Sequence, residues 1–234
     1  MTVIGFALKG AADTWPLFYF DREAMSKKSS DLHGNAPDHS KVALLLLDVI
    51  NDLEFEGGDL LAEHALPAAK KIASLKSRAR LAGIPTIYVN DNFGKWRSDF
   101  KQVLAHVIED ETRGRPIAEL LRPDAEDYFV LKPKHSGFFF TSLDLLLRHL
   151  GSEILILVGW AGDMCILFTA SDAHMRDYDL VIPGDCVASQ DAEENERVLK
   201  FMQRVQEADI RPSIELDLKQ LQRQSAKHAS EARA

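Results

Sequence analysis

Residues 154–175 read ILILVGWAGDMCILFTASDAHM, and this stretch decides the fold. It begins with a short apolar run, passes through the turn-like sequence GWAGD and continues with the apolar spacing of a helix. A short apolar run bounded by turn residues is typical of a strand that is buried on both faces of a parallel sheet. The stretch therefore predicts one strand that leads directly into a helix.

The same alternation of strand and helix covers most of the chain. Strand-like apolar runs occupy residues 42–48, 84–90, 127–132, 153–159 and 179–185. Amphipathic stretches lie between and after them, at residues 59–82, 97–109, 141–150, 165–176 and 191–206. Strict alternation implies right-handed crossovers and a sheet that helices cover on both faces. We therefore predict one doubly wound α/β domain.

This predicted domain spans residues 41–215. An N-terminal extension, residues 1–40, precedes it, and a C-terminal helix and polar tail, residues 216–234, follow it. The extension contains several aromatic residues, which could contribute to an interface between subunits. A dinucleotide-binding domain is not expected, because no G-x-G-x-x-G turn follows the first strand.

The composition excludes several classes of partner. The formal net charge of −8 argues against a nucleic-acid binder, which would usually carry a basic face. No stretch approaches the roughly 20 apolar residues that cross a membrane, and the N-terminus lacks the pattern of a signal peptide. Two cysteines do not form a disulfide framework in a chain of this length. We therefore expect a reducing environment and a cytoplasmic protein.

Three reactive residues lie at predicted strand ends, where open α/β sheets bind their ligands. Asp48 ends the first strand, Lys132 ends the third, and Cys165 follows the fourth where a helix begins. A cysteine at a helix N-terminus is expected to have a lowered thiol pKa, because the unpaired N–H groups favour an anion. The alternative is that Cys165 is a buried and inert core residue, as most lone cysteines are.

Asp48 and Lys132 also allow two interpretations. A carboxylate at the end of an apolar strand could take the thiol proton and return it to a leaving group, or could simply cap a turn. Lys132 could stabilise the charged forms of both Asp48 and Cys165 at the same time, or could be a surface lysine. Lys134, two residues further on, competes for the same role.

Three segments together resemble the isochorismatase-like cysteine hydrolases. They are LLLLDVINDLEFEGG at 44–58, LKPKHSGFFFTSLDLLLRHLG at 131–151 and ILVGWAGDMCILFTASDAHMRDYDLVIPGDCVAS at 156–189. The resemblance covers roughly residues 41–210. It implies a three-layer α/β/α sandwich with a six-stranded, mainly parallel sheet. It also implies an Asp–Lys–Cys triad that attacks C–N bonds of amides and ureido groups, although the isochorismatases themselves cleave a vinyl ether without a required cysteine.

Carried over by position, the resemblance assigns the triad to Asp48, Lys132 and Cys165. The family lysine lies four residues before the serine of an SAF-like motif, and here SGF begins at Ser136, which selects Lys132 over Lys134. The same resemblance implies an oxyanion hole formed by the N–H groups of Ala161 and Cys165. It further implies a cis peptide bond before Ala161.

The sequence departs from the family pattern near this site. Ile50 stands where glutamine is common, and Gly162 stands where threonine is common three residues before the cysteine. Family nicotinamidases bind a metal through aspartate and histidine after the second strand, whereas this chain has Asn92 and Gly94 there. We therefore expect no metal and no cofactor, and nicotinamide is a poor candidate substrate.

Several other residues are candidates for a substrate pocket. Trp160 and Phe138 adjoin the predicted triad, and pocket and core interpretations are equally open for both. Ile50 is a further candidate, and Asn92 could contact a polar substrate. Trp96 and Arg97 also follow the second predicted strand. We expect Trp96 to pack in the core and Arg97 to be solvated. Cys186 is expected to pack in the core.

The sequence therefore predicts a metal-free cysteine hydrolase that acts on a small amide or ureido compound. The resemblance suggests a homo-oligomer, either a dimer or a tetramer. One alternative is vinyl-ether hydrolysis that needs Asp48 and not Cys165. A second is a non-catalytic binding or interaction protein on the same scaffold, which the departures at Ile50 and Gly162 leave open.

Overall fold

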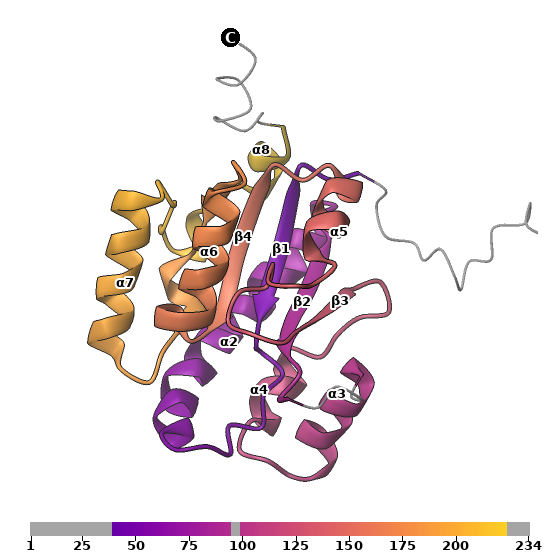
Figure 1. Ribbon diagram of the computed structural model, residues 1–234, viewed down its shortest axis with the longest axis vertical. Helices are drawn as coiled ribbons and strands as arrows, with labels where there is room; N and C mark the ends of the chain where they lie inside the picture. Colours follow the sequence, from indigo (N-terminus) through magenta and orange to yellow (C-terminus); the bar gives the residue numbers. More distant parts are fainter. Residues whose placement is uncertain (1–38, 95–98, 224–234) are drawn as a thin grey trace, which may run out of the picture. The chain divides into compact units, whose positions relative to one another are not determined.

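The computed structural model describes residues 39–94 and 99–223. The described strands are β1 (Val42–Leu47), β2 (Thr86–Asp91), β3 (Tyr128–Lys132), β4 (Ile154–Trp160), β5 (Asp179–Val181) and β6 (Val187–Ala188) (Figure 1). The described α-helices are α2 (Gly58–Leu81), α3 (Phe100–Glu109), α4 (Arg115–Leu120), α5 (Leu143–Leu150), α6 (Leu167–His174), α7 (Ala192–Val205) and α8 (Leu218–Arg223). A π-helical turn, Gly162–Ile166, directly precedes α6.

The strands form one parallel sheet in the order β3-β2-β1-β4-β5, and the short β6 pairs with the end of β4. The chain adds strands on one side of β1 and then returns to add β4 and β5 on its other side. The order therefore reverses between β1 and β4, which is where ligands bind in sheets of this kind. The predicted α/β fold with a six-stranded, mainly parallel sheet is confirmed.

Helices cover both faces of the sheet, because successive side chains of each strand point to opposite faces. From β1, Val42, Leu44 and Leu46 belong to one hydrophobic cluster, which includes side chains of α2, α3 and α4. Ala43, Leu45 and Leu47 belong to a second cluster with α5, α6 and α7. All six residues are fully buried, which explains why this strand reads as a continuous apolar run.

Two predicted elements differ from the observed ones for local reasons. The predicted strand at 179–185 ends at Val181, two residues before Pro183, which has no N–H to donate, and the chain pairs with the sheet again as β6. The predicted helix at 165–176 begins instead with the π-helical turn. There the Ala161 carbonyl accepts hydrogen bonds from the N–H groups of Met164 (3.0 Å) and Ile166 (3.1 Å).

Helix α8 lies in the predicted C-terminal region and contributes the buried Leu218 to the first hydrophobic cluster. None of the helices in residues 39–94 and 99–223 is long and apolar enough to span a bilayer. Residues 1–38 of the N-terminal extension, which include its aromatic residues, lie outside the described residues, as do Trp96 and Arg97. The domain boundaries and the homo-oligomer stay predictions.

Candidate active site

Asp48 directly follows β1 and is almost completely buried, at 6% exposure. Its backbone is left-handed (φ 55°), and its N–H donates to the Val89 carbonyl over 3.0 Å. One carboxylate oxygen, Oδ1, accepts a hydrogen bond from the Asp91 N–H over 2.8 Å. The side chain is thus held on one side by β2, and its second oxygen faces Lys132.

Lys132 is the last residue of β3, and its side chain is completely buried. Its Nζ lies 2.9 Å from Asp48 Oδ2 and 3.5 Å from Cys165 Sγ. Burial lowers the pKa of this ammonium group, but the charges of Asp48, Cys165 and Asp91 outweigh burial, so the pKa lies above its ordinary value. Lys132 therefore remains a cation between a carboxylate and a thiol. Lys134 is exposed, which agrees with the choice of Lys132.

Cys165 lies in the π-helical turn after β4 and is 9% exposed. The prediction of a lowered thiol pKa is wrong. Burial raises the pKa of this thiol and the negative charge of Asp48 raises it further, while Lys132 opposes them only in part. The direction of this shift favours the neutral thiol, because the low dielectric of the site disfavours a thiolate.

The turn that carries Cys165 does not contain the predicted cis bond. No cis peptide occurs among the described residues, so the prediction for the bond between Trp160 and Ala161 is wrong. The chain reverses instead through a left-handed Ala161, with φ 56° and ψ 66°. Gly159 contributes with φ 131°, and a Cβ there would lie 2.0 Å from the Leu47 carbonyl oxygen.

At Gly162, neighbouring side chains fill the space that a side chain would need. A Cβ at this position would lie 2.3 Å from Asn195 Oδ1 and 3.1 Å from Ser189 Oγ. The Gly162 N–H donates to Ser189 Oγ over 2.9 Å, and this hydroxyl in turn donates to Asn195 Oδ1 over 2.9 Å. The polar groups beside the turn thus come from the start of α7 and the residues before it.

The other predicted pocket residues are all buried. Trp160 and Phe138 are buried in opposite hydrophobic clusters, at 2% and 6% exposure. Ile50 is fully buried in the same cluster as Trp160. Asn92 is buried beside β3, where its N–H donates to the Lys132 carbonyl over 3.1 Å and its Oδ1 accepts from the Gly94 N–H. Their contact with a substrate stays a prediction.

Asp91 is a site residue that the sequence reading overlooked. Its carboxylate lies 3.6 Å from Lys132 Nζ, and its N–H holds Asp48. The available signal was its place at the end of the second strand, one residue before Asn92. Cys186, by contrast, is fully buried in the core as predicted.

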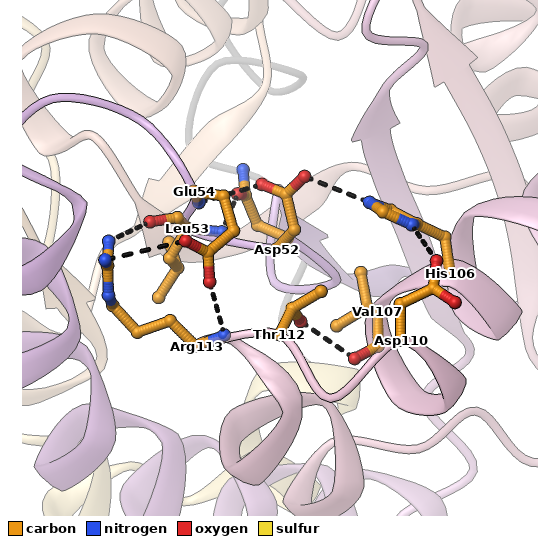
Figure 2. A network of polar contacts seen from close by, with 9 residues as sticks. Asp52, Leu53, Glu54, His106, Val107, Asp110, Thr112 and Arg113 are labelled. Atoms are coloured by element: carbon orange, nitrogen blue, oxygen red, sulfur yellow. Dashed lines mark hydrogen bonds and ion pairs between the residues drawn. The ribbon is translucent and has the colours of Figure 1, made fainter.

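The loop after Asp48 is fixed by a network of polar contacts (Figure 2). His106 of α3 bridges two carboxylates, with Nε2 3.1 Å from Asp52 Oδ2 and Nδ1 2.6 Å from Asp110 Oδ2. Arg113 donates from its backbone N–H to Glu54 over 2.8 Å and from Nη1 to the Leu53 carbonyl over 2.5 Å. These contacts tie residues 52–54 to the segment around α3, and so restrict the loop that carries Asp48.

This network is expected to weaken as the pH rises. Hydrogen bonds to Asp110 and Asp52 raise the pKa of His106, so its stabilisation is complete below the unfolded value of about 6.5 and is lost as the pH passes the raised value. We expect His106→Gln to lower the free energy of unfolding by about 0.5 kcal/mol at pH 6, a small effect because the group is exposed to solvent. Urea unfolding at pH 6 and pH 9 measures the difference, and a gap of equal size at both pH values would contradict this explanation.

The described residues contain no group of three or more His, Cys, Asp or Glu side chains placed to hold a metal ion. At the place where a metal ligand would be expected after β2, Asn92 Oδ1 is engaged by the backbone of its own turn. Asp48, Lys132 and Cys165 bring together a carboxylate, a buried ammonium and a thiol, which are the groups that covalent acyl transfer requires. The absence of a resident metal stays a prediction.

Comparisons with known proteins identify the family of this chain. YaaI of Bacillus subtilis (strain 168), an uncharacterized isochorismatase family protein, is 42% identical over 168 residues, which are 72% of this chain and 92% of that protein. Maleamate amidohydrolase of Pseudomonas putida is 28% identical over 67% of this chain and 76% of its own length. N-carbamoylsarcosine amidase from Thermoplasma acidophilum has a similar structure, with a TM-score of 0.60 and 27% identity over 76% of this chain and 99% of that chain. Residues 42–210 match the isochorismatase domain, so the chain belongs to the isochorismatase family.

Proposed function

We propose that this protein is a cysteine hydrolase that cleaves a C–N bond of a small amide or ureido compound. The observation that carries the proposal is the position of Lys132 Nζ between Asp48 Oδ2 and Cys165 Sγ, at the edge of the sheet where the strand order reverses. A buried nucleophile beside a carboxylate and a fixed cation suits covalent catalysis of acyl transfer. The names of two relatives, an amidohydrolase and an amidase, support the same reaction class.

The first half of the reaction forms a thioester. Asp48 takes the thiol proton as Cys165 Sγ adds to the substrate carbonyl carbon, and the carbonyl oxygen becomes an oxyanion. The N–H groups of Ala161 and Cys165 are proposed to hold this oxyanion. The C–N bond then breaks, and the leaving nitrogen takes the proton from Asp48 as ammonia or an amine departs.

The second half of the reaction releases the acid. Asp48, again a carboxylate, takes a proton from water as the water oxygen adds to the thioester carbonyl. The C–S bond breaks, the carboxylic acid departs, and Cys165 regains a proton from Asp48. A raised thiol pKa favours proton transfer to Asp48 at the same time as attack over a thiolate formed beforehand.

The test is release of ammonia from a panel of small primary amides and N-carbamoyl amino acids by the purified full-length protein. We expect turnover of at least one member of the panel, with the same rate in the presence and absence of EDTA. Nicotinamide serves as the matched amide that we expect to be a poor substrate. No release from any member, together with cleavage of isochorismate, would contradict the proposal and favour vinyl-ether hydrolysis.

A further inference from the structure

Asp91 contacts both ionic partners of the candidate triad. It is the last residue of β2 and pairs in register with Lys132, the last residue of β3. Its Oδ2 lies 3.6 Å from Lys132 Nζ, and its N–H donates to Asp48 Oδ1 over 2.8 Å. Its other oxygen, Oδ1, accepts from the Phe93 N–H over 2.6 Å, which fixes the direction of the carboxylate. Lys132 thus lies between two carboxylates.

The two carboxylates have different surroundings. The Asp48 side chain is 8% exposed, and its charge and hydrogen bond act on the Cys165 thiol. The Asp91 side chain is 35% exposed, so water solvates its charge, and it faces Lys132 from the side of β2. Asp48 is therefore the carboxylate placed to exchange a proton with sulfur, whereas Asp91 is placed to pair with the lysine.

This difference matters at one step of the proposed reaction. When Asp48 takes the thiol proton it becomes neutral, and Lys132 loses the partner at 2.9 Å. The negative charge passes through sulfur to the substrate oxyanion, so the completely buried ammonium of Lys132 loses its nearest carboxylate, and a buried cation is unfavourable unless it stays closely paired. A second carboxylate beside the same Nζ removes this problem.

We propose that Asp91 is a positioning residue that keeps Lys132 paired and charged while Asp48 carries the proton. The inference rests on the proposed function, since it assigns a task within that reaction. Asp91 makes no contact with Cys165, so it acts through Lys132. With Asp91 in place, the lysine keeps its position at 3.5 Å from Sγ throughout the cycle.

Asp91→Asn tests this inference because it removes the charge and keeps the backbone N–H that holds Asp48. The asparagine Oδ1 can still accept from the Phe93 N–H. We expect kcat for amide hydrolysis to fall at least tenfold with KM unchanged within about twofold, because the affected state forms after substrate binding. We also expect Cys165 to react with iodoacetamide three- to tenfold faster at pH 8. In the variant only one carboxylate offsets the charge of Lys132, so the lysine stabilises the Cys165 thiolate more than in wild type.

Asp124→Asn is the matched control. It removes a carboxylate 3.0 Å from another buried lysine, Lys76, and should change neither rate. A loss of kcat in Asp91→Asn with unchanged alkylation would overturn the inference, because a purely structural role produces that result. Wild-type rates in both assays would overturn it as well. If wild type hydrolyses no amide, the alkylation rates still decide whether Asp91 acts on Lys132, so failure of the proposed function is recognised separately.

Discussion

Cys165→Ser is expected to abolish amide hydrolysis, with a loss of at least about 10³-fold in kcat, while the protein remains folded. The substitution exchanges only sulfur for oxygen at a buried position 3.5 Å from Lys132 Nζ. A hydroxyl is a much weaker acid than a thiol, so Asp48 cannot activate it to the same extent. Ammonia release measures the activity, and thermal unfolding checks the fold.

Cys186→Ser provides the matched control for this experiment. Cys186 is the other cysteine of the chain and is fully buried in the core, where burial raises the pKa of its thiol to about 12. We expect this variant to keep its activity within about twofold. Full activity in Cys165→Ser would refute covalent catalysis by Cys165, and a requirement for Asp48 alone would then favour vinyl-ether hydrolysis.

The strands could be predicted, and the residues at their ends could be singled out as candidates, because both depend on local sequence. Buried parallel strands are apolar on both faces, and reactive residues at their carboxyl ends meet at one edge of the sheet. The family resemblance selected Lys132 over Lys134, and in the structure Lys132 is buried whereas Lys134 is exposed. The family resemblance of three separate segments indicated that Asp48, Lys132 and Cys165 belong to one candidate site.

The properties that could not be predicted depend on packing between distant segments. The thiol pKa is raised because Cys165 is buried next to Asp48, and a local rule about helix N-termini cannot detect that burial. The space beside Gly162 is filled by Asn195, which lies on the first turn of α7. Such contacts are set by the fold as a whole, so neither segment alone indicates them.

Asp91 illustrates the same limit within the site itself. The sequence analysis did not single it out, because it directly follows the predicted strand at 84–90, whereas pairing of β2 with β3 puts it opposite Lys132. The register of two strands separated by α3 and α4 determines this contact, and single-sequence patterns do not specify register to one residue.

Asp48→Asn is expected to change two rates in opposite directions. Hydrolysis should fall about 10²- to 10⁴-fold, because the amide cannot accept the thiol proton or return it to the leaving nitrogen. Alkylation of Cys165 by iodoacetamide should become faster than in wild type at the same pH. Burial is the largest cause of the raised thiol pKa and remains in the variant, but the negative charge of Asp48 is the next cause and is removed.

Lys132→Met completes the experiment, because it removes the group that lowers the thiol pKa. In this variant both hydrolysis and alkylation should be slower than in wild type, and circular dichroism must show that the fold persists without the buried pair to Asp48. Site-resolved mass spectrometry at several pH values separates the alkylation of Cys165 from that of Cys186.

Slower alkylation of Cys165 in Asp48→Asn would contradict the proposed electrostatics, since it would mean that the carboxylate promotes the thiolate at rest. Faster alkylation with lost turnover would instead support a neutral thiol that gives up its proton to Asp48 only as the substrate is attacked.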